Sequence, residues 1–203
     1  MTVYLFSGTP GSGKSAHQAM IIYYAIKTHK PVIANFDIDR KAFKDSSSFF
    51  YVDNVYMSPT TLMKFAEIWF KNNKFHEGAI KVFIDEAQIM FSNRDWKNNA
   101  EWIKFFTQHR KLGMDVYLVA QNHEMIDKHI RSLVEYEVHH RKVNNVGWFG
   151  KLVSVICLGH PVFVAVTKWY GQRMRLGAEW FLGRKKFFNL YNTYKLFDNS
   201  QLD

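Results

Sequence analysis

A glycine-rich octapeptide near the N-terminus constrains the fold more than any other stretch of the chain. It fits the pattern G-x-x-x-x-G-K-[ST], which is typical of a phosphate-binding P-loop. Its residues are Gly8, Thr9, Pro10, Gly11, Ser12, Gly13, Lys14 and Ser15. Such a loop binds phosphate through backbone N–H groups and a helix N-terminus, so it must join a strand to a helix. Residues 3–6 are predicted to form that strand, and residues 16–28 that helix.

The P-loop pattern assigns a role to each of its parts. The glycines let the backbone wrap an anion without Cβ clashes. Lys14 is expected to reach the β- and γ-phosphates of ATP, and the Ser15 hydroxyl to bind Mg²⁺. Ala16 completes the predicted nucleotide-binding set. The alternative is a glycine-rich turn that matches by chance, and the flanking strand and helix argue against it.

A second landmark is the apolar strand predicted over residues 81–84, which ends in Asp85 and Glu86. An apolar strand followed by an acid is the usual form of a Walker B strand. Asp85 would then hold Mg²⁺, directly or through water, and Glu86 would activate the attacking water. An ordinary strand-end cap is the alternative. The distance of about 70 residues from a P-loop, with helices between, favours the Walker B interpretation.

Other polar residues follow predicted strands or end predicted helices. Asn35 comes just after the strand predicted over residues 32–34, at the edge where α/β sheets bind ligands. Gln121 follows the strand of residues 115–120 and could sense the γ-phosphate, or it could be a turn residue. Arg110 ends the helix predicted over residues 96–112. Its positive charge could stabilise the C-terminal end of the helix dipole, or it could reach a nucleotide on a neighbouring subunit.

The charge of the chain is uneven along its length. The formal net charge is +9, from 27 Lys and Arg against 18 Asp and Glu. Residues 139–195 hold ten of those cations and only one acid, Glu179. This surplus suggests a polyanionic partner, either nucleic acid or an anionic membrane surface, although a basic surface kept for solubility is the alternative.

The C-terminal part is predicted to be a β-hairpin formed by residues 152–158 and 162–168, around Gly159-His160-Pro161. The weaker alternative is a membrane span over residues 152–170, because that stretch carries one charge. His139 and His140 do not predict zinc, since adjacent strand residues face opposite sides of a sheet. The lone cysteine, Cys157, excludes an internal disulfide and favours a reducing compartment. No signal peptide is expected.

Several of these motifs occur in an order that resembles a known family. The P-loop is followed by Ile84-Asp85-Glu86-Ala87-Gln88, His109-Arg110-Lys111-Leu112-Gly113-Met114-Asp115, Val119-Ala120-Gln121 and Ile126-Asp127-Lys128-His129-Ile130-Arg131. Over residues 2–142 this looks like the zonular occludens toxin (Zot) family, whose members are ATPases that assemble and export filamentous phage. Lys111 departs from the family motif, which usually has histidine there.

The resemblance implies an α/β fold of the P-loop NTPase kind, RecA-like and of the additional-strand catalytic-glutamate type. A mostly parallel sheet flanked by helices would carry the C-terminal hairpin as an appendage. The core would span residues 1–143, and a basic, aromatic-rich extension residues 144–203. The resemblance further implies a ring, for instance a hexamer, with Arg110, or else Arg131 or Arg94, acting in trans.

The implied activity is Mg²⁺-dependent ATP hydrolysis that drives export of single-stranded phage DNA with its coat proteins. It would take place in the host cytoplasm, at the inner membrane, beside other assembly and export proteins. Two alternatives stay open at the level of sequence. One is a P-loop nucleotide kinase, with the arginines of the tail as a lid. The other is a scaffold that binds nucleotide without turnover.

Overall fold

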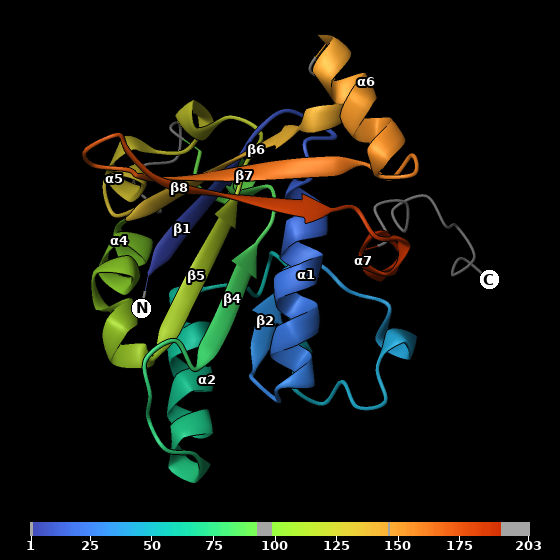
Figure 1. Cartoon of the computed structure of the whole chain (residues 1–203). Coiled ribbons are helices and arrows are strands. Elements are labelled where there is room, and N and C mark those ends of the chain that lie inside the picture. The colour runs from blue at the N-terminus through green and yellow to red at the C-terminus, as the bar shows by residue number, and fades with distance from the viewer. Residues whose placement is uncertain (1, 93–98, 146, 192–203) are drawn as a thin grey trace, which may run out of the picture.

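An eight-stranded sheet with helices on both faces organises the structure, a computed structural model that describes residues 2–92, 99–145 and 147–191 (Figure 1). The strands are β1 (Val3–Ser7), β2 (Val32–Ala34), β3 (Phe49–Tyr51), β4 (Ile80–Ile84), β5 (Met114–Val119), β6 (Tyr136–Lys142), β7 (Val162–Trp169) and β8 (Met174–Leu182). The described helices are α1 (Lys14–Lys27), α2 (Pro59–Asn72), α3 (Ala87–Met90), α4 (Asn99–Gln108), α5 (Lys128–Arg131), α6 (Gly147–Ile156) and α7 (Lys185–Leu190). Short 3₁₀ turns lie at Arg40–Ala42, His109–Leu112, His123–Met125 and Val143–Asn145.

The order of the strands is β3-β2-β4-β5-β1-β6-β7-β8. In this order, the six neighbouring strands from β3 to β6 all run parallel to one another. β5 lies between β1, which leads into the P-loop, and β4, which leads into Asp85. This inserted strand is the topology expected of the additional-strand class. Because the strands are parallel, the P-loop, Asp85 and Gln121 all follow strands at one edge of the sheet.

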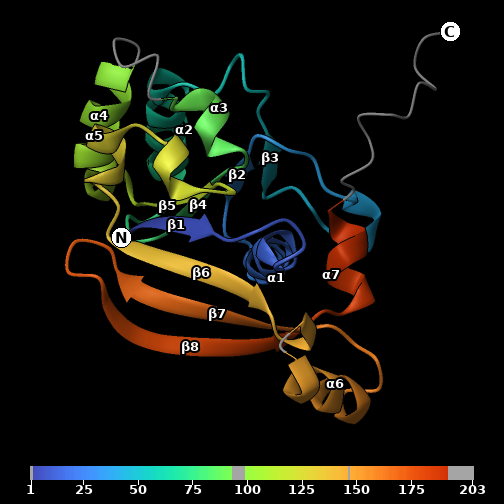
Figure 2. The same cartoon turned by 90° about the horizontal axis from the view of Figure 1, so that it is seen from above.

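Alternation along the strands divides the core into two layers. Leu5 packs with α2 and α4 on one face, whereas Phe6 packs with α1 on the other. The same alternation separates Val82 from Phe83 in β4. α1 packs on the Phe6 face directly after the P-loop, with α7 beside it (Figure 2).

The C-terminal part differs from the predicted hairpin. Residues 152–158 do not form a strand, because α6 covers residues 147–156. β7 instead pairs antiparallel with β6 on one side and with β8 on the other. Asn144 explains the change: its Oδ1 accepts from the Val162 amide at 2.6 Å and so starts β7 beside the end of β6. The residues between Asn144 and Val162 therefore leave the sheet, and they include helix α6.

α6 projects from the body of the protein and carries unusual side chains for an exposed helix (Figure 2). Trp148, Val155 and Ile156 are each at least 70% exposed, as is Leu158 just after the helix. The stretch predicted as an alternative membrane span, residues 152–170, is thus divided between α6, a turn and β7. None of the described helices is both long enough and apolar enough to span a bilayer.

Other sequence predictions have clear outcomes. Ser58 caps α2, accepting from the Thr61 amide at 3.2 Å. The helix predicted over residues 96–112 is α4 followed by a 3₁₀ turn, with residues 96–98 outside the described part. The division at residue 143 stays a prediction.

Candidate nucleotide-binding site

The P-loop adopts a conformation that requires glycine at two positions. Gly8 has a φ of 138°, and a Cβ there would lie 2.6 Å from the His140 carbonyl oxygen. Gly13 has a φ of 101°, and a Cβ there would lie 2.5 Å from the ring of Phe163. Because the backbone is left-handed at both positions and leaves no room for a Cβ, only glycine fits there. The loop is therefore held between α1 and the strands β6 and β7.

Lys14, at the first position of α1, turns back over the loop. Its ammonium donates to the Gly8 carbonyl at 2.5 Å and to the Thr9 carbonyl at 3.2 Å. Burial lowers the pKa of Lys14, and the negative charges of Asp85 and Glu86 oppose that shift. Because β1 and β4 run parallel on either side of β5, the P-loop lysine and both predicted Walker B acids lie at the same edge of the sheet.

Asp85 is held by three neighbours at the end of β4. Asn35 Oδ1 accepts a hydrogen bond from the Asp85 amide at 2.7 Å. Asn35 Nδ2 donates one to the Asp85 carbonyl at 2.9 Å. The Tyr191 hydroxyl donates to Asp85 Oδ2 at 2.5 Å. Burial raises the pKa of Asp85, while the bonds from Tyr191 and the Glu86 amide lower it in part. Asn35 thus fixes the backbone of the acid at the edge where we expected a ligand residue.

Glu86 occupies a strained position immediately before α3. Its φ of 48° and ψ of 44° are left-handed, which is uncommon for a residue with a side chain. Its side chain is exposed, and Gln88 donates to its Oε2. Strained backbone of this kind is concentrated at active sites, where the rest of the fold holds one group in a required orientation. The exposed, oriented carboxylate suits the predicted activation of water.

Ser15 and Asp85 offer Mg²⁺ the ligands it prefers. A hydroxyl and a carboxylate are hard oxygen donors, and Mg²⁺ normally takes only one or two protein ligands beside phosphate oxygens and waters. Among the described residues no group of three His, Cys, Asp or Glu could form a cage for a metal. The donor set therefore fits a nucleotide-borne Mg²⁺, and Ser15 and Asp85 stay the predicted ligands.

The remaining predicted residues lie at different places. Gln121 is exposed after β5, at the same edge as the P-loop. Arg110 precedes β5 and so lies at the opposite edge, where it donates to Glu135 Oε1 at 3.0 Å. Arg131 is at the end of α5. Arg94 lies outside the described residues. Within one copy of the chain, Arg110 is thus separated from Lys14 by the length of the sheet.

A buried histidine pair lies directly behind the P-loop. His17 Nδ1 and His140 Nε2 are 2.8 Å apart, and His140 Nδ1 is 3.3 Å from the Ser7 carbonyl oxygen. His139, the next residue of β6, instead contacts the Ser7 hydroxyl through its Nδ1 at 3.0 Å. Burial lowers the pKa of His17 to about 4 and that of His140 to about 3. The pair is therefore neutral in the folded chain at neutral pH.

This pair predicts a loss of stability in acid. The unfolded chain takes up protons on both imidazoles as the pH falls below about 6.5, whereas the folded chain does not until about pH 4. The stabilisation is present above pH 6.5 and is lost as the pH falls toward 4. The free energy of unfolding should fall by on the order of 2–4 kcal/mol between pH 7 and pH 5.

Urea unfolding at the two pH values measures this effect. His140→Gln should reduce the pH dependence by about half, because one of the two buried imidazoles no longer titrates. His29→Gln is the matched control, since the His29 side chain is 74% exposed and lies outside the pair of His17 and His140. An unchanged pH dependence in His140→Gln would contradict the assignment.

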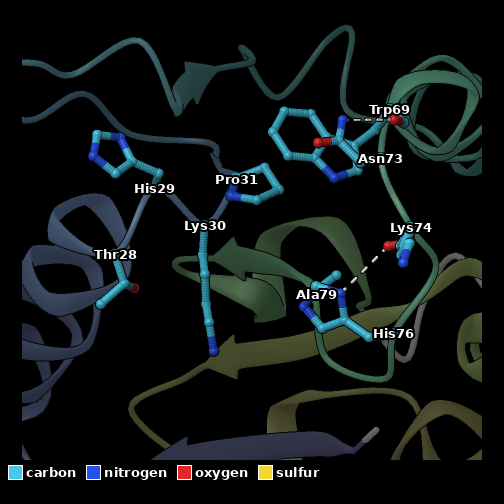
Figure 3. Close-up of a pocket in the computed structure, with 9 residues that line it drawn as sticks. All are labelled: Thr28, His29, Lys30, Pro31, Trp69, Asn73, Lys74, His76 and Ala79. Carbon is cyan, nitrogen blue, oxygen red and sulfur yellow. Dashed lines mark hydrogen bonds between the residues drawn. The ribbon is translucent and has the colours of Figure 1, made fainter.

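A pocket of about 300 Å³ lies elsewhere, between the end of α1 and the end of α2 (Figure 3). Its lining includes His29, Pro31, Trp69 and Ala79. Pro31 and Ala79 directly precede β2 and β4, so the pocket is at the sheet edge opposite the P-loop. It is therefore not the nucleotide site.

Three features of the site were not predicted from the sequence. Tyr191 reaches Asp85 from 106 positions away in the chain. Gln88 contacts Glu86, and His17 pairs with His140. Only the Gln88 contact is local, and a polar side chain two residues after the Walker B glutamate could have suggested it.

Comparison with known proteins identifies the family of this chain. The family model described as zonular occludens toxin (Zot) matches residues 2–194. The chain belongs to the Zot family. The resemblance found in the motifs is thereby confirmed, and it extends beyond residue 142, where those motifs end.

The curated relatives of this Zot-family chain include the gene 1 protein of Enterobacteria phage M13. The two are 25% identical over 213 residues, which cover 98% of this chain and 61% of the relative. The gene 1 protein of Enterobacteria phage fd is 26% identical with the same coverage. The chain thus spans about three-fifths of the length of these relatives.

Solved structures show the fold. The DNA-packaging ATPase B204 from Sulfolobus turreted icosahedral virus has a TM-score of 0.55 at 17% identity, covering 88% of this chain and 96% of that one. A second solved ATPase domain has a TM-score of 0.61 at 9% identity, covering 94% of this chain and 84% of that one. The predicted P-loop NTPase fold is confirmed.

Proposed function

We propose that this chain is an Mg²⁺-dependent ATPase that drives assembly and export of filamentous phage. The observation that carries the proposal is the convergence of Lys14, Asp85 and the left-handed Glu86 at one sheet edge, with β5 inserted between their strands. Lys14 would hold the β- and γ-phosphates, and Ser15 with Asp85 would hold the metal. Glu86 would take the proton of the attacking water.

The bound Mg²⁺ would supply charge neutralisation at the phosphates. Apart from Pro10, which has no N–H, the P-loop residues Gly8 to Ala16 would supply N–H donors, with Gly13 and Lys14 at the start of α1. Gln121 would orient the water or sense the γ-phosphate from the end of β5. These roles are assigned residue by residue, and each can be tested separately.

The arrangement favours hydrolysis over the two alternatives. A nucleotide kinase would need several arginines over the acceptor phosphate. Arg173 and Arg175 flank the first residue of β8, at the sheet edge opposite the P-loop, because β7 runs away from that loop and β8 runs back. Of the tail arginines this leaves only Arg184, which follows the end of β8, at the P-loop edge. A scaffold without turnover gives no reason for the strained backbone at Glu86. Phosphate release and transfer assays separate the three functions.

We infer that the active unit is a ring in which Arg110 reaches the nucleotide of a neighbouring copy. Within its own copy Arg110 is at the far edge of the sheet, with a side chain 64% exposed. A cation placed there can stabilise a transferring phosphoryl group only in trans. Its bond to Glu135 would hold the guanidinium until a neighbour is present.

Mixing two inactive variants tests this inference. Arg110→Ala should lower ATP turnover by roughly 10³-fold or more, which is the usual effect of removing an arginine finger. Adding Glu86→Gln protein should restore part of the activity, because mixed rings contain interfaces with an intact Glu86 and an intact Arg110.

Glu135→Gln is the matched control for Arg110. It breaks the ion pair of Arg110 and Glu135 but leaves the arginine free to act in trans. It should keep the turnover of the wild type. Equal losses in Glu135→Gln and Arg110→Ala, with no recovery on mixing, would show that Arg110 serves the fold of its own copy.

The charge of the chain supports an anionic partner, and membership of the Zot family suggests the others. The cationic surplus of residues 139–195 supports contact with single-stranded phage DNA or an anionic membrane surface. Coat proteins and inner-membrane export proteins would complete the assembly at the cytoplasmic face. Stimulation of ATP turnover by single-stranded DNA would support the nucleic-acid partner.

A further inference from the structure

The segment that follows β8, residues 183–191, returns across α1 to the nucleotide site, and we call it the C-terminal arm. Its helix α7 lies beside α1 in both views (Figures 1 and 2). Phe187 is buried against the rings of Tyr23 and Tyr24, and the Lys186 ammonium lies 4.6 Å from the centre of the Tyr23 ring. The arm is therefore packed on the helix that begins at the P-loop.

The arm ends in a tyrosine that contacts the Walker B acid. The Tyr191 hydroxyl donates to Asp85 Oδ2 at 2.5 Å, and its ring packs edge-on against Phe36 with centres 4.8 Å apart. The Asp39 amide donates to the Leu190 carbonyl at 3.0 Å and fixes the end of the arm. Tyr191 is thus placed by contacts with the segment that follows β2.

Both oxygens of Asp85 have donors from the chain itself. Oδ2 accepts from Tyr191, and Oδ1 accepts from the Glu86 amide at 3.0 Å. Lys14 is likewise engaged, by the carbonyls of Gly8 and Thr9. The groups expected to meet Mg²⁺ and phosphate therefore both have intramolecular partners in this structure.

We propose that Tyr191 is a latch on the metal site, whose hydroxyl competes with Mg²⁺ and its water ligands for Asp85. The inference rests on the proposed role of Asp85 as a magnesium ligand. Waters bound to Mg²⁺ donate hydrogen bonds to carboxylates, so they approach Asp85 Oδ2, the oxygen that already accepts from the phenol. Binding of Mg²⁺ with nucleotide therefore frees Tyr191, and α7 loosens from α1.

Tyr191→Phe tests the latch because it removes the hydroxyl and keeps the ring against Phe36. We would measure binding of a non-hydrolysable ATP analogue as a function of Mg²⁺ concentration. Half-maximal Mg²⁺-dependent binding should require roughly tenfold less Mg²⁺ in the variant, the effect expected from losing one hydrogen bond to a carboxylate. In EDTA the two proteins should bind the analogue equally.

Tyr24→Phe is the matched control, because Tyr24 also contacts the arm but its side chain is 52% exposed. It should leave the Mg²⁺ dependence unchanged. As a second readout, amide exchange of residues 185–191 in the wild type should accelerate with Mg²⁺ and analogue together, but not with analogue in EDTA.

Two results would overturn the latch. A higher Mg²⁺ requirement in Tyr191→Phe would make Tyr191 a residue that positions Asp85, and an unchanged requirement would leave it without a part in metal binding. Failure of the proposed function looks different. The wild type would then bind the analogue no better than Lys14→Ala, and the latch would fall with it.

Discussion

Glu86→Gln should lower ATP turnover strongly while leaving nucleotide binding intact. The substitution keeps the size of the side chain and removes the carboxylate that would accept a proton from the attacking water. General-base catalysis contributes roughly 10²- to 10⁴-fold, so turnover should fall by that factor. Lys14, Ser15 and Asp85 are untouched, so affinity for Mg²⁺ and ATP should stay close to that of the wild type.

Steady-state phosphate release and equilibrium binding of ATP measure the two effects separately. Gln88→Ala is an informative companion, because Gln88 contacts Glu86 but cannot itself take a proton. It should reduce turnover less than Glu86→Gln does. Full turnover in Glu86→Gln would remove this residue from the mechanism and restore the kinase alternative.

Gly13→Ala should impair both folding and nucleotide binding. A Cβ at this position requires a left-handed residue with a side chain and places it 2.5 Å from the Phe163 ring. Relieving that clash moves the start of α1, whose N–H groups face the predicted phosphate site. Loss of two N–H bonds to phosphate, at about 1.5–3 kcal/mol each, predicts at least a roughly 100-fold fall in ATP affinity.

The stability of Gly13→Ala should also fall, by about 1–3 kcal/mol, from the backbone strain. Gly177→Ala is the matched control, since Gly177 lies in β8 with no heavy atom within 4 Å of an added Cβ. It should keep ATP affinity. Urea unfolding and nucleotide titration of both variants provide the comparison. Wild-type affinity in Gly13→Ala would show that the P-loop does not bind phosphate in the expected way.

Local patterns made the nucleotide edge predictable from the sequence. The P-loop, the apolar strand before Asp85 and the strand before Gln121 each have a signature within about ten residues. Parallel pairing then brings the ends of those strands together. The placement of Arg110 at the far edge follows from the same logic, since it precedes β5 rather than following it.

The C-terminal part could not be predicted in this way. Residues 152–158 are rich in Val and Ile, which favours a strand, yet the position beside β7 is taken by β6. The deciding contact, from Asn144 to Val162, joins residues 18 positions apart and leaves no pattern in the sequence. The hydrogen bond from Tyr191 to Asp85 joins residues that are even farther apart in the chain, 106 positions.

The most direct test of the motor is steady-state ATP hydrolysis per subunit against protein concentration, with and without single-stranded DNA. An assembled DNA motor should show a rate that rises with concentration, increases with DNA and falls strongly in Glu86→Gln. A rate that is independent of concentration, unaffected by DNA and retained in Glu86→Gln would contradict it.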